Sequence, residues 1–183
     1  MVDNFFWDKD NKCVCWSNNG KDIKVNVENM YFACLEMQKK YIFVEVGKNY
    51  SQDQIYYFSF DGNKIFTVDK VTGSVSWQSK DEVVNVQCDN LVSAQFYIEH
   101  ELVLVITSNK QNERLLGFAL NGKKLFEKGP PQDYNFRYLS TSANFPSVVC
   151  DGGKTNADAY GRSNWHFVIN TLTGDMTKCS LAY

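Results

Sequence analysis

Short runs in which apolar and polar residues alternate follow one another along the whole chain, separated by turn-forming residues. Alternation with a period of two is typical of β-strands that bury one face. Four of the turns end in glycine, at Gly20, Gly73, Gly122 and Gly174, and each lies between two strand-like runs. These glycines are 53, 49 and 52 residues apart. The pattern therefore predicts an all-β, antiparallel meander of about four repeated sheet units.

A fifth turn of the same kind, Asp61-Gly62, falls outside this spacing. It is compatible with two registers for the second unit. In one, the turn opens that unit. In the other, the unit consists of Tyr41–Val46, Gln54–Phe60 and Asn63–Val68. Both registers keep an antiparallel meander of about four units, but they predict different strand orders.

Sheet units need a way to protect their edges, because open edges aggregate. We expect one small β-propeller-like domain over residues 1–183, with a β-sandwich or a flattened barrel as the alternative. The run Asn4–Trp7 is then available to complete the last unit, as in many propellers, and pairing between two copies in a homodimer is another way to close the ring. Met30–Met37 has some helix-forming residues, but we interpret it as a strand.

One turn carries a recognisable motif. In Ile65–Trp77 a strand is followed by Asp69, two residues, Thr-Gly and a second strand that ends in Trp; Phe167–Gly174 has the same turn, with Asn170 in place of Asp. An Asp or Asn side chain bonds the backbone two residues on, and glycine accepts the left-handed position. The motif resembles the blade repeat of quinoprotein-like (PQQ-type) β-propellers. The resemblance implies a propeller-type fold and no quinone chemistry, and we expect no cofactor.

Composition excludes several function classes. The net charge is −2, and Lys and Arg are scattered along the chain, so nucleic acid and anionic membranes are not expected partners. No apolar run approaches the roughly 20 residues that a bilayer span requires. The six cysteines come without a secretion signal, which favours free thiols and a cytoplasmic location. A secreted chain whose leader had been removed would have the same sequence.

Two cysteines are close in sequence. Cys13 and Cys15 are at positions i and i+2, so a strand points both side chains to one face. Zinc would need two further ligands, and no Cys-x-x-Cys or His-x-x-x-His partner exists. We expect these thiols to pack in the core and predict no metal site, with a metal or redox role as the alternative.

Candidate catalytic groups are few, because the chain has only two histidines. His166 lies on a predicted strand beside the strand of Cys150, and the two could form a nucleophile–base pair. We favour a strand histidine on a solvated face. His100, in Glu99-His100-Glu101, is expected in a solvated turn.

The most unusual segment is the loop 151–164, which is rich in Gly, Asn and Asp and lies between two strands of the last unit. Binding residues concentrate on such loops when a rigid scaffold holds them. Its Gly-Gly-Lys-Thr stretch lacks the upstream glycine of a phosphate-binding loop and no helix follows, so we do not interpret it as one. The predicted ligand- or partner-binding residues are Tyr134, Asp151, Lys154, Asp158, Tyr160, Arg162 and His166.

Taken with the absence of a catalytic constellation, these features indicate a non-catalytic binding or interaction module. Loops 151–164 and 129–135 would carry the contact with a protein partner or with a small ligand or glycan. A carbohydrate-binding, lectin-like domain is the first alternative, since Tyr and Trp suit sugar stacking. A small hydrolase that uses Cys150 and His166 is the less favoured one.

Overall fold

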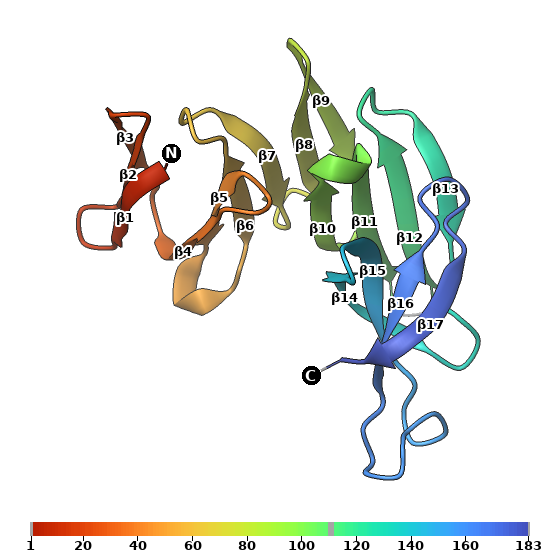
Figure 1. The fold of residues 1–183 in the computed structure, drawn as a ribbon. Coiled ribbons are helices and arrows are strands. Elements are labelled where there is room, and N and C mark those ends of the chain that lie inside the picture. Colours follow the sequence, from red (N-terminus) through yellow and green to blue (C-terminus); the bar gives the residue numbers. More distant parts are fainter. Residues whose placement is uncertain (1, 110–111, 183) are drawn as a thin grey trace. The chain divides into compact units, whose positions relative to one another are not determined.

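The fold is described from a computed structural model that covers residues 2–109 and 112–182 (Figure 1). The regular secondary structure of these residues consists of β-strands, apart from the short 3-10 helices η1 (Lys48–Tyr50) and η2 (Ile98–His100). The predicted all-β class and the antiparallel pairing are confirmed, with four sheets of three to six strands. No helix of the described residues has the length and apolar character that a membrane span needs. The chain divides into two compact units between Gln87 and Cys88, and the single-domain interpretation stays a prediction.

The first unit contains two antiparallel sheets. Sheet 1 has the order β1-β2-β3, and sheet 2 has the order β4-β5-β6-β7-β8-β9. The strands of sheet 1 are β1 (Val2–Asp8), β2 (Cys13–Asn18) and β3 (Lys21–Asn26). Those of sheet 2 are β4 (Met30–Glu36), β5 (Tyr41–Val46), β6 (Gln54–Phe58), β7 (Lys64–Asp69), β8 (Ser74–Ser79) and β9 (Glu82–Gln87).

Alternate side chains of the two sheets fill the core of the first unit. Val14 and Trp16 of β2 pack in one cluster with Ile42, Val44 and Val46 of β5. The Trp16 indole is 2% exposed, and its Nε1–H donates to the carbonyl of Phe60 over 2.7 Å. Burying a Trp this fully requires a partner for the indole N–H, and the backbone of the β6–β7 turn provides it.

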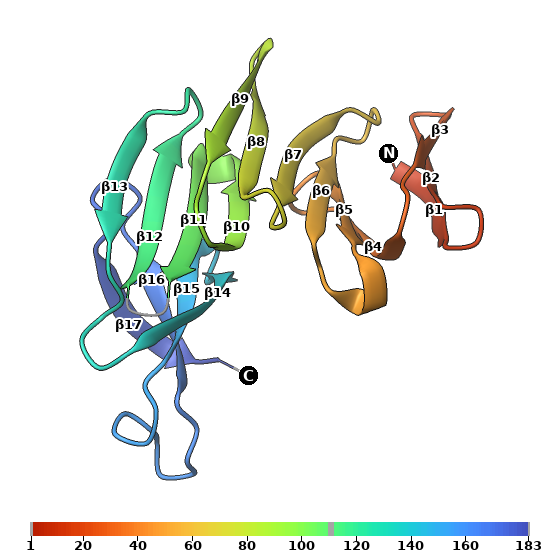
Figure 2. The same cartoon turned by 180° about the vertical axis from the view of Figure 1, so that it is seen from behind.

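The second unit contains two four-stranded meanders (Figure 2). Sheet 3 consists of β10 (Leu91–Tyr97), β11 (Leu102–Asn109), β12 (Asn112–Ala119) and β13 (Lys124–Lys128). Sheet 4 consists of β14 (Asn135–Ser142), β15 (Phe145–Asp151), β16 (Asn164–Ile169) and β17 (Met176–Leu181). Within each sheet the strands pair in sequence order.

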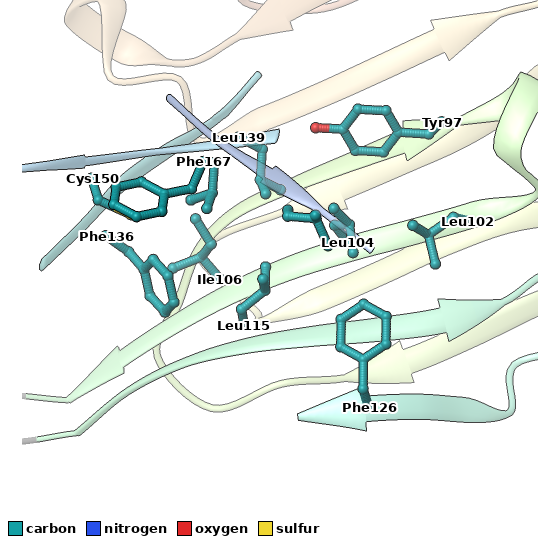
Figure 3. Packing of buried hydrophobic residues seen from close by; sticks show 12 residues of the cluster. Tyr97, Leu102, Leu104, Ile106, Leu115, Phe126, Phe136, Leu139, Cys150 and Phe167 are labelled. Carbon is teal, nitrogen blue, oxygen red and sulfur yellow. The ribbon is translucent and has the colours of Figure 1, made fainter. Parts of the chain in front are cut away.

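One cluster of buried side chains joins sheets 3 and 4 (Figure 3). Leu104 and Ile106 of β11 meet Cys150 of β15 and Phe167 of β16 in this cluster. The Phe126 ring closes it beside two glycines: an added Cβ would lie 2.2 Å from the ring at Gly117 and 2.4 Å from it at Gly174. The ring can pack there only because both positions lack a side chain.

The same strand pairing occurs in three of the sheets. In each, a bulge interrupts the first pair of strands directly after the first buried residue of the first strand. In sheet 2, Met30 pairs with Val46 and Phe32 with Glu45. The corresponding pairs are Leu91–Thr107 and Ser93–Ile106 in sheet 3, and Phe136–Cys150 and Tyr138–Val149 in sheet 4. A bulge twists and bends the strand that carries it. The three meanders therefore start with the same local geometry.

The turns have the side-chain chemistry that the sequence predicts, but equivalent turns do not recur at the predicted interval of about 50 residues. Asp69 Oδ1 accepts from the amides of Val71 and Thr72, and Asn170 Oδ1 accepts from those of Leu172 and Thr173, so the two motif turns are alike. Gly62 instead matches Gly122. Both amides donate over 2.9 Å to the residue three positions earlier.

This assigns the second predicted register, with Asp61-Gly62 between β6 and β7. The four evenly spaced glycines close different kinds of turn, so their spacing does not mark equivalent positions. Met30–Glu36 is a strand, as we interpreted it. The run Asn4–Trp7 belongs to β1, which pairs with β2 in sheet 1. That this run completes the last unit stays a prediction.

Candidate functional site

The loop 152–163 connects β15 to β16 in the second unit, where it projects beyond the ends of both strands (Figure 1). The ladder between these strands ends at the pair Asp151–Asn164. One further backbone bond, from the Gly152 amide to the Ser163 carbonyl at 2.9 Å, closes the base of the loop. Beyond that bond, side chains and a few local backbone bonds hold the loop.

Asp151 anchors the two ends of the loop. Its Oδ1 accepts from the Ser163 hydroxyl at 2.7 Å and from the Gly153 amide at 2.9 Å, and its Oδ2 pairs with Arg137 of β14. The Ser163 bond, followed by the Gly153 and Arg137 contacts, lowers the pKa of this carboxyl to about 2. Hydrogen bonds of this kind favour the charged form. Asp151 is therefore a carboxylate with a positioning role, with its oxygens occupied by the protein.

Asp158 fixes the tip. Its Oδ1 accepts from the amides of Tyr160 and Arg162, both at 2.9 Å, and its Oδ2 accepts from Arg162 Nε at 2.7 Å. The contact with Arg162 is the main cause of a lowered pKa at Asp158. The Gly161 amide donates to the Asp158 carbonyl, so residues 158–162 form a closed turn.

Tyr160 stands out on this turn. It is 84% exposed, the highest value among the large exposed hydrophobic side chains. The guanidinium carbon of Arg162 lies 5.3 Å from its ring centroid, a cation–π contact. Lys154 is also exposed on the loop. The tip thus presents an aromatic ring beside the Arg162 guanidinium, which is ion-paired with Asp158, on a backbone that Asp158 holds in place.

The base of the loop rests on a cluster that the sequence predicted only in part. Asn156 Nδ2 donates to the Asp133 carbonyl, and the Trp165 Nε1–H donates to the Asn156 carbonyl at 3.0 Å. Lys178 Nζ lies 3.7 Å from the Trp165 ring centroid and donates to the Tyr134 hydroxyl at 2.9 Å.

Of this cluster, only Tyr134 was among the predicted site residues. Its ring meets Phe167 edge-on, with centroids 4.9 Å apart, so the cluster is continuous with the core. Trp165 could have been found from its place at the start of β16, next to the loop. Lys178 gives no signal in the sequence, because it lies 44 residues from Tyr134.

His166 lies apart from the loop residues. It pairs with Val149, whereas Cys150 pairs with Trp165, so the His166 and Cys150 side chains point to opposite faces of the sheet. Cys150 is fully buried in the core, where desolvation raises the pKa of its thiol to about 12. The nucleophile–base pair considered from the sequence is therefore not formed.

On its own face, His166 belongs to a hydroxyl network. Its Nδ1 is 3.1 Å from the Ser140 hydroxyl, which lies 2.7 Å from the Ser147 hydroxyl. The site residues thus separate into two groups. Lys154, Asp158, Tyr160 and Arg162 share the loop, whereas His166 is elsewhere. Asp151 anchors the loop from the end of β15, and Tyr134 supports its base. Among the residues that the structure describes, no group of three or more His, Cys, Asp or Glu side chains is placed to hold a metal ion.

Comparison with known proteins gives only distant structural matches. No family model and no curated protein matches the chain. The chain is similar to a streptogramin B lyase structure, with a TM-score of 0.48 and 9% identity over 98% of this chain and 65% of that one. It is also similar to a functionally unknown protein from Desulfotomaculum acetoxidans, with a TM-score of 0.39 and 9% identity over 96% of this chain and 50% of that one. A eukaryotic initiation factor matches with a TM-score of 0.41 and 11% identity over 96% of this chain and 54% of that one. The chain spans about two thirds or less of these structures, and matches this distant assign it neither a family nor an activity.

Proposed function

We propose that this chain is a non-catalytic binding module of the β-propeller type, and that the tip of loop 152–163 forms its contact surface. The observation that carries the proposal is the combination of constraint and exposure at this tip. Asp158 holds the backbone of residues 160 and 162 through 2.9 Å hydrogen bonds, while Tyr160 is 84% exposed. The fold part of the proposal is supported by the recurring four-stranded meander and by the motif turns at Asp69 and Asn170.

A constrained, exposed aromatic is suited to binding. Ordering a loop on association costs free energy, and a loop that is already ordered avoids most of this cost. Tyr and Arg are enriched among the residues that dominate binding energy. Tyr160 and Arg162 are adjacent at the tip, with Lys154 on the same loop. We expect the partner to be a protein that covers the Tyr160 ring.

The proposal also covers the type of partner, the oligomeric state and the cellular location. A small ligand or glycan in place of a protein is the alternative, because an exposed tyrosine also stacks on sugars. Homodimerisation through the same loop is a third arrangement, and neither nucleic acid nor membrane is a proposed partner. We place the module in the cytoplasm, in keeping with six free cysteines.

A hydrolase is not proposed, because Cys150 and His166 lie on opposite faces of sheet 4. Two of the hollows in the described residues can be compared with the loop. One, of about 260 Å³ in the first unit, is lined by residues 25–29, Val46, Gln54, Tyr56, Phe58 and Lys64. The other, of about 290 Å³, is lined by Ser108, Asn109, residues 112–114, Pro130 and Asn135. Neither includes His166 or the loop tip.

The test compares two exposed side chains. Immobilised wild-type protein, Tyr160→Ala and Leu172→Ala are each used to capture proteins from an extract of the source cells, with quantitative mass spectrometry. Leu172 is a matched control, since it is 79% exposed at the tip of the β16–β17 turn. We expect a partner that wild type and Leu172→Ala retain and that Tyr160→Ala loses by about tenfold or more.

The same three proteins on a glycan array separate the alternatives. A glycan signal that depends on Tyr160, without a Tyr160-dependent protein, would replace the protein partner with a sugar. Sedimentation analysis of the same proteins tests the dimer. If neither proteins, glycans nor self-association depend on Tyr160, the loop is not the contact surface and the proposal is wrong.

A further inference from the structure

Two thiols lie side by side in sheet 1, far in sequence from the contact loop. Cys13 and Cys15 lie on β2, with their sulfur atoms 3.9 Å apart. They alternate with Val14 and Trp16, which belong to the packed core of the first unit. Because side chains alternate across a strand, both thiols point to the other face of the sheet. Cys13 is 4% exposed and Cys15 is partly exposed, so the pair is reached from the Cys15 side.

The neighbours of the pair come from both flanking strands. Cys15 lies opposite Phe6 of β1 and Lys24 of β3. Cys13 lies opposite Asp8 and Asn26 on the same two strands. Burial raises the pKa of the Cys15 thiol, and so does its contact with Cys13; the Lys24 ammonium acts against both, with a smaller effect. The Cys15 thiol is therefore protonated at neutral pH, and a bound cation would displace its proton.

The sulfur separation matches a shared metal ion. With metal–sulfur bonds of about 2.3 Å, an ion can contact two sulfurs 3.9 Å apart at a sulfur–metal–sulfur angle of about 116°. This angle is close to those of trigonal and tetrahedral ions, so one further ligand from solvent or a soluble thiol would complete the coordination. From this geometry we infer that Cys13 and Cys15 form a binding site for a soft cation of the Cu(I) class.

The number of ligands selects the cation. Zinc takes four ligands in structural sites, and residues 2–109 and 112–182 provide no group of three or more His, Cys, Asp or Glu side chains that could hold it. Thiolates are soft ligands that select Cu(I) among the biological metals, and Cu(I) accepts low coordination numbers. Binding replaces two S–H bonds with two Cu–S bonds, gives an anionic bis-thiolate complex and releases two protons, with no change of oxidation state. Its affinity should therefore rise with pH.

The experiment is a competition for Cu(I). Reduced protein is titrated under anaerobic conditions into the coloured complex of Cu(I) with bicinchoninate, and loss of colour reports transfer of the metal. Wild type should remove one equivalent. Cys15→Ser and Cys13→Ser should each lower the apparent affinity by about tenfold or more, since even losing an outer-shell contact costs about 10- to 100-fold at many metal sites.

Two other cysteines provide matched controls. Cys34→Ser and Cys179→Ser change one partly exposed and one exposed thiol at other places in the chain and should transfer Cu(I) as wild type does. Far-ultraviolet circular dichroism checks the fold. If Cys13→Ser does not fold, because Cys13 is buried, the partly exposed Cys15 carries the test alone. Wild-type transfer by Cys15→Ser, or loss of transfer in Cys179→Ser, would overturn the inference.

Discussion

Two connections flank β16, and they are built in opposite ways. The turn from Asn170 to Gly174 joins β16 to β17, and the loop 152–163 joins β15 to β16. The turn is short, its amides are satisfied by the Asn170 side chain, and its glycine lies against the Phe126 ring of the core. The loop is longer, and two carboxylates, Asp151 and Asp158, hold it away from the core.

If the loop is the contact surface that we propose, the difference separates stability from recognition. Contacts of the turn bury apolar surface and continue the strand ladder, so they should contribute to the stability of the second unit. Contacts of the loop tip are hydrogen bonds and ion pairs in water, where an ion pair contributes little to stability. They fix the position of Tyr160 without making the fold depend on it. A loop of this kind can change its sequence at little cost to the scaffold, which suits the contact surface that we propose.

The largest expected effect comes from adding one methyl group to each connection. Gly174→Ala places a Cβ at 2.4 Å from Phe126 Cδ2 on a backbone with φ of 74°, whereas Gly153→Ala, with φ of 55°, has nothing within 4 Å. The left-handed backbone costs about 1–2 kcal/mol in both, and overpacking adds about 1–3 kcal/mol in Gly174→Ala alone. Urea unfolding should show a loss of about 3 kcal/mol for Gly174→Ala and about 1 kcal/mol for Gly153→Ala.

A second substitution checks the cause of that difference. Phe126→Leu in the Gly174→Ala background should recover part of the lost stability, although Phe126→Leu alone is destabilising. If Gly174→Ala and Gly153→Ala lose the same amount of unfolding free energy, the contact with Phe126 does not contribute to the difference. The turn would then differ from the loop only in length.

A smaller effect is expected from removing the side-chain acceptor of each connection. Asn170→Ala leaves the Leu172 and Thr173 amides without their bond to Oδ1 and should lower the stability of the second unit by about 1 kcal/mol. Asp158→Ala should leave the urea midpoint unchanged and instead speed hydrogen exchange at the Tyr160 and Arg162 amides. A loss of stability in Asp158→Ala as large as that in Asn170→Ala would contradict the division between the two connections.

The same contrast explains what the sequence could predict. The turns at Asp69 and Asn170 use partners two and three residues away, so their chemistry is visible in a short motif. The even spacing of the glycines was misleading, because a glycine is needed in several kinds of turn and the letter alone does not distinguish them. The match between Gly62 and Gly122 emerges only from the strand pairing.

The candidate site was likewise predictable only where its residues are close in sequence. Asp151, Asp158, Tyr160 and Arg162 lie in one segment of unusual composition, and the structure brings them together on one loop. The support of that loop was not predictable, because Lys178 reaches the Tyr134 hydroxyl across 44 residues. His166 was grouped with the loop by proximity in sequence. The register that pairs it with Val149 directs it to the other face of sheet 4.

The smallest effect concerns the protonation of Asp151. Its pKa is lowered to about 2, chiefly by the Ser163 hydroxyl, so the carboxylate contributes stability above the unfolded-state pKa of about 4 and loses that contribution as pH falls toward 2. Carboxyl-carbon chemical shifts measured from pH 5 to pH 1.5 should give a midpoint near 2 for Asp151. Ser163→Ala should raise the midpoint, and the Gly153 amide should shift with it, because that amide donates to the same oxygen. A midpoint near 4 in wild type would show that the base of the loop is not held by this carboxylate, and the loop would lose the constraint that distinguishes it from a flexible connection.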